Sequence, residues 1–168
     1  MSGYTAGRRC GKHDDYMTPK SAWENIRHLI PANKVIWEAF YGDGKSGEAL
    51  QELGFQVIHQ DTDFFQHNLG DIVVSNPPFS KTKDVLRRLR ELEKPFILIL
   101  PALKIHNLYL SELFKDTPDR LQVIIPRKRI HFKKLVGGKP VEGWKDATSF
   151  ECFYYCWKIG MERDIVWL

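Results

Sequence analysis

The stretch "DIVVSNPPFSKTKDVLRRLRELEKPFILIL", residues 71–100, decides the fold. It opens with an apolar strand at residues 72–75 and closes with an almost wholly apolar one at residues 96–100. Between them, residues 81–93 repeat apolar side chains at helical spacing, and Pro95 ends the helix. An apolar run like the second strand is typical of a sheet that helices cover on both faces. We therefore expect an α/β fold with a mainly parallel sheet.

The alternation of strands and helices continues on both sides of this stretch. Thr18-Pro19 predicts a helix start, with Thr18 as N-cap and Pro19 at the first helical position. Further helices are expected from about Ser46 and at about residues 102–114. The other expected strands are residues 35–40, 55–59, 121–125 and 150–157. Four basic side chains of the 81–93 helix are expected to face solvent: Lys83, Arg87, Arg88 and Arg90.

The composition is that of one globular domain. The chain has 168 residues, of which 43% are hydrophobic and 27% are charged. We expect residues 1–13 to form a flexible tail and residues 14–168 to form a single domain. No apolar run approaches the ~20 residues of a membrane-spanning helix, and no apolar segment follows the basic residues near the N-terminus. These features predict an intracellular protein, in the cytoplasm or in a host cell, without a membrane partner.

The cysteines point to packing rather than to chemistry. Three cysteines are too few for a disulfide framework, which agrees with a reducing compartment. Cys10 and His13 have a spacing seen in metal sites, but two further ligands at matching spacing are missing, so we expect no metal. Cys152 and Cys156 fall on one face of an expected strand, where they are interpreted as packing residues.

Basic residues gather in one window of the sequence. The whole chain has a net charge of only +4, yet residues 127–145 hold seven Lys or Arg against one acid, Glu142. The seven are Arg127, Lys128, Arg129, Lys133, Lys134, Lys139 and Lys145. A local basic patch on a nearly neutral body suggests a polyanionic partner. A solvated charged loop is the alternative, and it is the commoner origin of a charge run.

Two unusual segments follow expected strands. They are residues 38–44, with a glycine turn, and residues 76–79, Asn-Pro-Pro-Phe. In parallel sheets ligands sit beyond the carboxyl ends of the strands, so both segments should lie on one rim. The glycine turn lacks the first glycine of a phosphate-binding loop. It meets the spacing of a dinucleotide fingerprint, and Asp61 and Asp63 stand near the place of the acid that this fingerprint requires, although not in a good strand-end position. The glycines alone therefore do not choose the ligand.

The acidic residues of this rim indicate which class of ligand it could bind. Glu38 and Asp61 each stand at or just past the end of an expected strand. Carboxylates there would bind hydroxyl groups or an ammonium group and would repel phosphates. A cofactor with a ribose and a cationic amino-acid tail suits them better than a nucleoside triphosphate, and S-adenosylmethionine is such a molecule.

The Asn-Pro-Pro-Phe segment suits an amine substrate. Pro77 and Pro78 have no N–H and a fixed φ, so the carbonyls of this turn are held in set directions, and Asn76 adds a side-chain acceptor. Such acceptors, converging on an adenine N6 amine, would stabilise the charge that develops as it attacks a methyl sulfonium. Phe79 offers a face for base stacking, worth ~1–3 kcal/mol in comparable sites. The alternative is a plain loop anchored by a buried ring.

With these motifs the chain resembles the class I S-adenosylmethionine-dependent methyltransferases, and specifically those that methylate amino groups and carry [DNS]-P-P-[YFW]. It looks most like the small phage- and virus-type DNA N6-adenine methyltransferases. The similar stretches are "DDYMTPK" (14–20), "WEAFYGDG" (37–44), "HQDTDFF" (59–65), "VVSNPPFS" (73–80), and "RKRIHF" with "SFECFYYCW" nearer the C-terminus. The resemblance covers roughly residues 14–157. It implies a Rossmann-like fold with a mainly parallel seven-stranded sheet, helices on both faces, and S-adenosylmethionine as cofactor.

The resemblance also implies residue roles. The residues at the reacting amine would be Asn76, Pro77, Pro78 and Phe79. The cofactor would be bound by Tyr16, Thr18, Pro19, Glu38, Phe40, Gly42, Gly44, Asp61, Asp63 and Phe64, with Asp61 on the ribose and Asp63 and Phe64 at the adenine. The target would be bound by Arg127, Lys128, Arg129, Lys133, Lys134, Lys139, Trp144 and Lys145.

We expect the polymer partner to be DNA, with RNA as the next most favoured alternative. Larger members of the family carry a sizeable target-recognition region, whereas here only about residues 127–148 are available for it. Sequence specificity would then be short, or supplied by a second copy or an accessory subunit. A target base within a duplex would have to be flipped out to reach Asn76.

Other functions stay open at this point. RNA adenine methyltransferases share the motif, and protein glutamine methyltransferases resemble it, typically with Tyr in the place of Phe79 and without need of a basic window. Cytosine C5 methylation is disfavoured, because its thiolate nucleophile typically follows a proline and none of the three cysteines does. A nucleic-acid-binding module that has kept the fold without catalysis is a further alternative.

Overall fold

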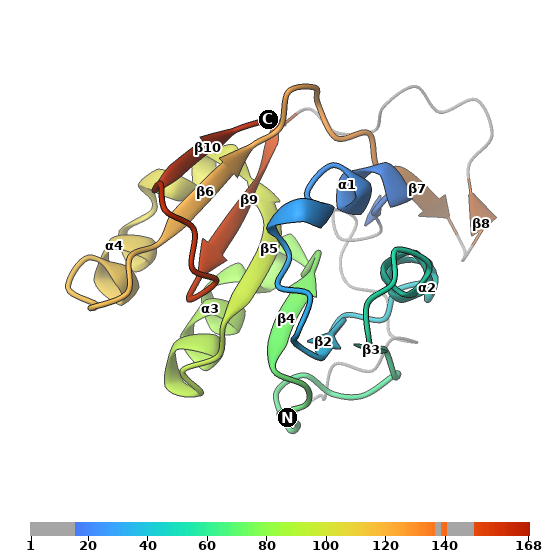
Figure 1. Cartoon of the computed structure of the whole chain (residues 1–168), viewed down its shortest axis with the longest axis horizontal. Coiled ribbons are helices and arrows are strands. Elements are labelled where there is room, and N and C mark those ends of the chain that lie inside the picture. Colours follow the sequence, from blue (N-terminus) through green and yellow to red (C-terminus); the bar gives the residue numbers. More distant parts are fainter. Residues whose placement is uncertain (1–15, 137–138, 141–149) are drawn as a thin grey trace.

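A central sheet of seven strands organises the molecule (Figure 1). The computed structural model describes residues 16–136, 139–140 and 150–168. The strand order is β10-β6-β9-β5-β4-β2-β3. The strands are β2 (Ile36–Trp37), β3 (Val57–Ile58), β4 (Ile72–Ser75), β5 (Phe96–Pro101), β6 (Gln122–Ile125), β9 (Cys152–Trp157) and β10 (Ile165–Trp167). Only β9 runs antiparallel to its neighbours, so the expected mainly parallel, seven-stranded Rossmann-like sheet is confirmed.

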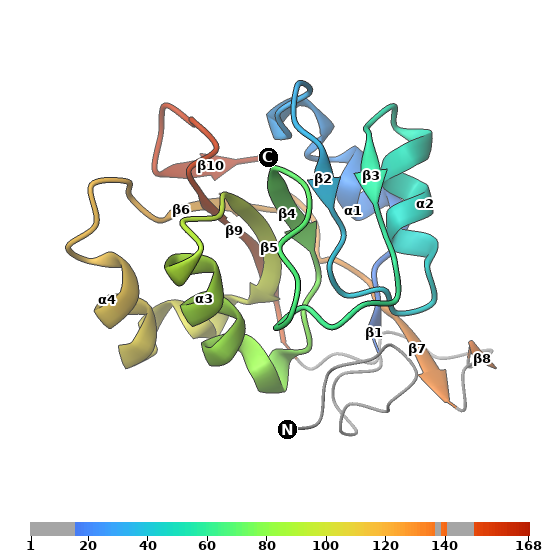
Figure 2. The same cartoon turned by 90° about the horizontal axis from the view of Figure 1, so that it is seen from below.

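Helices cover both faces of this sheet (Figure 2). Helices α1 (Lys20–Glu24) and α2 (Lys45–Glu52) pack on one face, and α3 (Thr82–Glu91) and α4 (Leu108–Phe114) pack on the other. Alternate residues of each strand therefore enter two different cores, which explains why β5 is apolar on both sides. Within the described part of the chain, no helix has the length and apolar character to cross a membrane.

Strand β9 shows this division most clearly. Cys152 and Cys156 join the core under α1 and α2, while Tyr155 and Trp157 join the core under α3 and α4. Both cysteines are buried free thiols, and burial raises the pKa of Cys152 to about 12. Their prediction as packing residues is confirmed. Cys10 and His13 lie outside the described residues.

The first helix differs from its prediction. It begins at Lys20, so that Pro19 stands at the N-cap position with extended backbone, and no side chain caps it. Thr18 is therefore not the N-cap, and the predicted start was wrong by one residue. The helix ends at Glu24 and is followed by a 3-10 turn, η1 (Arg27–Leu29). Ile26, which lies between them, is fully buried and has non-helical backbone angles, φ −112° and ψ 8°.

The predicted helix at residues 102–114 is also divided. A 3-10 turn, η3 (Ala102–His106), follows β5 directly, and α4 starts only after Asn107, whose backbone is extended at φ −69° and ψ 136°. Another 3-10 turn, η2 (Phe79–Lys81), connects β4 to α3. Both turns follow prolines at strand ends, where the chain has to change direction before a helix can pack on the sheet.

Two of the arginines on α3 are not simply solvated, in contrast to the prediction. Arg88 donates from Nε to the Phe64 carbonyl (3.0 Å) and from Nη2 to the His67 carbonyl (2.9 Å). Arg90 donates from Nε to the Leu113 carbonyl (3.0 Å). Long arginine stems can lie along apolar surface and place the guanidinium on exposed carbonyls. Arg88 thus fastens α3 to the loop after β3, and Arg90 fastens it to the end of α4.

Sequence reasoning missed a second, three-stranded sheet. Strand β7 (Lys133–Val136) pairs with β1 (Tyr16–Met17) and with β8 (Lys139–Pro140). Tyr16 lies opposite Lys134, and Met17 lies opposite Lys133. Figure 2 shows β1 and β7 next to the segment that leaves β2. The pairing thus joins the basic window to the N-terminal motif.

Candidate active site

The sheet topology itself marks a ligand position. From β2 the chain goes to β3 on one side and then to β4 on the other, so the strand order reverses between β2 and β4. In open α/β sheets ligands bind in the crevice beyond the carboxyl ends at such a reversal. The segments that follow these two strands are residues 38–44 and 76–79. The structure therefore brings together the two segments in which the sequence indicated chemistry.

Asn76 presents an unused acceptor at this position. Its side-chain Nδ2 donates to the Tyr16 carbonyl at 3.3 Å, which identifies the other amide atom as the oxygen. Among the described residues, Asn76 Oδ1 is buried and has no hydrogen-bond partner. Leaving a buried acceptor unpaired costs about 1–3 kcal/mol, so such an atom at a strand reversal indicates a place for a ligand donor.

The rest of this turn supports the same geometry. Pro77 is buried and Pro78 is half-buried, and neither has an N–H that could compete for the acceptors. The Pro78 carbonyl accepts from the Lys81 N–H at 3.0 Å, which closes the η2 turn. The acceptors that we assign to a ligand are therefore Asn76 Oδ1 and the Pro77 carbonyl.

Phe79 belongs to an aromatic cluster made of Tyr16, Phe79, Phe132 and Phe150. Its ring meets the Phe150 ring at 5.5 Å and the Phe132 ring at 6.5 Å between centroids, both edge to face. Tyr16 contacts the same two rings, at 6.2 and 6.3 Å. Phe79 remains half-buried, so its orientation is fixed while part of it stays accessible. Sequence reasoning missed Phe132 and Phe150. Phe132 is the last residue of "RKRIHF" and Phe150 is the second residue of "SFECFYYCW", two stretches that carried the resemblance.

Glu38 is buried at the centre of a hydrogen-bond network. Ser46 Oγ donates to Oε2 at 2.7 Å, Ser75 Oγ donates to Oε1, and the Phe40 N–H donates to Oε1 at 3.2 Å. Only 1% of the residue is exposed. Its predicted contact with a cofactor stays a prediction. What the structure shows is that Glu38 connects the glycine turn, through Ser46 and Phe40, with Ser75 beside Asn76.

The burial of Glu38 makes folding stability depend on pH. Burial raises the pKa of its carboxyl from the ordinary 4.5 to about 7, against the opposing effect of the serine hydrogen bonds. The folded state therefore holds this proton more tightly than the unfolded state. The stability that this group contributes is complete below about pH 4.5 and is lost as pH rises through about 7. At 1.36 kcal/mol per pKa unit, the loss is about 3 kcal/mol.

Glu38→Gln is expected to remove this dependence. Urea unfolding at pH 5 and pH 8 should show wild-type stability falling relative to the variant by about 2.5 kcal/mol between the two pH values, because part of the loss has already occurred at pH 5. The comparison between the two proteins cancels the titration of other groups. Equal changes in the free energy of unfolding for both proteins would mean that Glu38 is not protonated preferentially in the folded state.

The glycine turn fits closely against the N-terminal segment. Gly42 and Gly44 have φ of 60° and 81°, a region that residues with a Cβ rarely adopt. A Cβ on Gly42 would lie 3.2 Å from the Met17 sulfur, and one on Gly44 would lie 2.9 Å from the Tyr41 hydroxyl. Asp43 between them accepts from the Lys45 N–H at 3.1 Å, which holds the first turn of α2. Gly42 and Gly44 thus allow a tight loop beneath β1.

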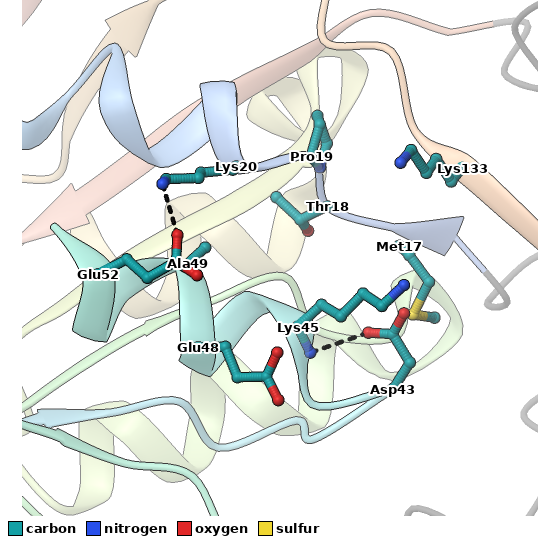
Figure 3. A pocket seen from close by; sticks show the side chains of 10 residues that line it. All are labelled: Met17, Thr18, Pro19, Lys20, Asp43, Lys45, Glu48, Ala49, Glu52 and Lys133. Carbon is teal, nitrogen blue, oxygen red and sulfur yellow. Dashed lines mark hydrogen bonds and ion pairs between the residues drawn. The ribbon is translucent and has the colours of Figure 1, made fainter.

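A pocket of about 250 Å³ opens between this loop, α2 and β7 (Figure 3). It is lined by Met17, Thr18, Pro19, Lys20, Asp43, Lys45, Glu48, Ala49, Glu52 and Lys133. Thr18 and Pro19 are predicted cofactor contacts, and the structure places them beside the glycine turn. Lysines and carboxylates both line the pocket, so it offers partners for a group that carries both signs of charge, such as an amino acid.

The residues that follow β3 differ in how far they are buried. Asp61 is exposed, which agrees with a role on ribose hydroxyls. Asp63 is 9% exposed and accepts from the Phe65 N–H at 2.9 Å. Phe64 is 1% exposed, and its ring packs 4.9 Å from that of Phe40. This burial argues against the predicted contact between Phe64 and a cofactor adenine, because a core ring has no free face. Phe65 is the ring that reaches the surface here.

The basic window is only partly a free cationic surface. Arg127 and Lys128 are exposed just beyond the carboxyl end of β6, and Lys139 is exposed on β8. Arg129 is half-buried and donates to the Phe150 carbonyl at 3.3 Å, so it supports the aromatic cluster. Lys133 lines the pocket. The backbone of Lys134 pairs with β1, whereas Trp144 and Lys145 lie outside the described residues.

Three comparisons with known proteins were made. No protein-family model matches the chain, and no curated protein matches it. Among solved structures, one similar chain is a Listeria monocytogenes protein provisionally assigned as a class I S-adenosylmethionine-dependent methyltransferase. The identity is 11%, the match covers 96% of this chain and 67% of that one, and the TM-score is 0.46.

Proposed function

We propose that the protein transfers a methyl group from S-adenosylmethionine to the N6 amine of adenine in DNA. The observation that carries this proposal is the buried Oδ1 of Asn76, which has no hydrogen-bond partner in the described part of the chain and lies at the reversal between β2 and β4. It lies in a turn whose two prolines offer carbonyl acceptors and no donors. A planar amine with two hydrogens is the ligand that such an arrangement suits.

The chain offers suitable groups for this cofactor. The amino-acid tail would lie between the glycine turn and Thr18-Pro19, where lysines and carboxylates are both present. Asp61 is exposed beyond β3 and would accept hydrogen bonds from the ribose hydroxyls. A nucleoside triphosphate would bind poorly there, because carboxylates repel phosphates. When bound, S-adenosylmethionine would supply an electrophilic methyl group and would leave as S-adenosylhomocysteine.

The protein's own contribution is to hold the acceptor amine. Asn76 Oδ1 and the Pro77 carbonyl would each accept a hydrogen bond from one N–H of the N6 amine. These two bonds would orient the nitrogen lone pair for attack on the methyl group. As the nitrogen gains positive charge, the same two oxygens stabilise it, and the excess proton then leaves to solvent. Phe79, held by Phe132 and Phe150, stacks on the base. No strong base is needed before the attack.

Duplex DNA fits the exposed cations at the same end of the sheet. Arg127 and Lys128 follow β6, whose carboxyl end points the same way as those of β4 and β5. In the strand order they lie on the side of Asn76 away from β2 and β3. The segments that follow β2 and β3 are the ones that would bind the cofactor. Phosphate contacts there position the polymer, and the target base turns out of the stack toward Asn76.

The proposal is tested by the polymer that accepts the methyl group. Radiolabelled S-adenosylmethionine is incubated with the protein and unmethylated duplex DNA, single-stranded DNA, RNA, or a protein extract. We expect the wild-type protein to label DNA and the Asn76→Ala variant to lose this activity. Label in RNA alone, or in a protein, would replace DNA as the substrate. Tight cofactor binding without label in any polymer would indicate a silent nucleic-acid-binding module.

A further inference from the structure

The two strands that carry the site are held together beyond their backbone pairing by side chains. The β2–β4 ladder ends where Trp37 lies opposite Val73. Glu38 and Ser75 lie just beyond this point, and Ser75 Oγ donates to Glu38 Oε1. Ser75 is fully buried and is the residue immediately before Asn76. The bond thus spans the strand reversal at the base of the acceptor turn.

The other carboxylate oxygen of Glu38 connects to the cofactor side. Ser46 Oγ donates to Oε2 at 2.7 Å, and Trp23 Nε1 donates to Ser46 Oγ at 2.9 Å. Ser46 stands in the first turn of α2, directly after the glycine turn, and Trp23 is buried in α1. One chain of hydrogen bonds therefore passes from α1 through α2 and β2 to β4. The two serines hold opposite sides of the same carboxyl group.

We infer that Ser75 is a positioning residue that, through Glu38, fixes Asn76 relative to the glycine turn and thereby sets the alignment of the amine with the methyl group. This inference rests on the proposed function, because it assumes that Asn76 holds the reacting amine. Ser46 has the complementary role on the glycine turn. Ser75 should therefore affect turnover, and Ser46 should affect cofactor affinity.

The size of the effect follows from geometry. Without the Ser75 hydroxyl, the hydrogen bond between Glu38 Oε1 and the end of β4 is lost, while Ser46 and Phe40 still hold the carboxyl group on the cofactor side. A displacement of about 1 Å between reacting groups can cost roughly 100-fold in rate. A residue that only stabilised the fold would instead lower stability without separating turnover from cofactor affinity.

The kinetic test compares Ser75→Ala and Ser46→Ala with Ser111→Ala, an exposed serine in α4 on the other face of the sheet. Binding of S-adenosylhomocysteine is measured by calorimetry, and kcat is measured at saturating cofactor and DNA. Ser75→Ala should lower kcat by about 10- to 100-fold with a cofactor Kd within about 2-fold of wild type. Ser46→Ala should mainly raise Kd, and Ser111→Ala should change neither.

Equal rises in Kd for Ser75→Ala and Ser46→Ala, or an unchanged kcat for Ser75→Ala, would overturn the inference. Ser75 is fully buried, so Ser75→Cys is the substitute if the alanine variant does not fold. A thiol is a weak donor of similar size, so the same selective loss of kcat is expected, at smaller amplitude.

A second measurement separates this inference from the proposed function. The side-chain amide resonance of Asn76, assigned by its loss in Asn76→Asp, is followed in ¹⁵N-labelled protein without substrate. It should shift in Ser75→Ala and stay unchanged in Ser111→Ala. If no polymer is methylated but this shift is seen, the function fails and the positioning role stands. If the resonance does not move, the positioning role fails even where wild type is active.

Discussion

Asn76→Ala is expected to lower kcat for methyl transfer by about 100- to 1,000-fold, the range found when one preorganised group that stabilises transition-state charge is removed. The variant loses Oδ1, the buried atom that has no partner within the described structure. Cofactor affinity should stay within about 2-fold of wild type, because the pocket beside Thr18 and the glycine turn is unchanged. Calorimetry with S-adenosylhomocysteine and single-turnover kinetics measure the two quantities separately.

Two further variants show which atom of Asn76 matters. Asn76→Asp keeps an acceptor oxygen but loses the Nδ2 hydrogen bond to the Tyr16 carbonyl, so it should retain more activity than the alanine variant. Asn107→Ala is the matched control, since the Asn107 side chain also donates a hydrogen bond, to the Tyr109 hydroxyl at 3.1 Å. Turnover retained in Asn76→Ala would refute the acceptor mechanism. Equal inactivity of the aspartate variant would assign the role to the amide nitrogen.

Charge reversal of Arg127 and Lys128 to Glu is expected to weaken duplex binding by roughly 10-fold or more at moderate salt. Both side chains are exposed at the carboxyl end of β6. Each phosphate contact that is lost should also reduce the slope of log K against log salt concentration by about 0.9. Fluorescence anisotropy with a labelled duplex at several salt concentrations measures both effects. These two residues are a cleaner choice than Lys133, which also lines the pocket.

The control for this prediction reverses the same amount of charge elsewhere. Lys83 and Arg87 are exposed on α3, and the double change to Glu there alters net charge equally. Its affinity for DNA should fall much less, and its salt slope should not change. If both double variants weaken binding alike, the effect comes from net charge, and the end of β6 is not the docking surface.

Much of the fold could be predicted from residues 71–100. The apolar strands and the amphipathic helix between them lie within one or two residues of their predicted positions. Long-range pairing could not be predicted in the same way. β7 begins with two lysines and pairs with a two-residue strand near the N-terminus, so neither partner carries a recognisable alternation. β10 has only three residues, and its Trp167 is 75% exposed, so it also lacks the pattern of a buried strand.

The site was predictable where a motif dictates backbone chemistry. The prolines and glycines of the two turns are such cases, and the structure places both turns at the strand reversal. Ser46 and Ser75 were not singled out, because a serine has no distinctive spacing of its own. The available signal was a polar residue closing the apolar strand β4. The burial of Phe64 could not be predicted, because a family motif assigns a residue type to a role without showing which way its ring points.

The central claim, methylation of adenine N6, is tested most directly by identifying the product nucleoside. Unmethylated duplex DNA is incubated with the protein and S-adenosylmethionine, digested to nucleosides and analysed by mass spectrometry, with Asn76→Ala in parallel. The account predicts N6-methyldeoxyadenosine with wild type and at least about 100-fold less with the variant. A different methylated nucleoside, or none from a protein that binds the cofactor, would contradict it.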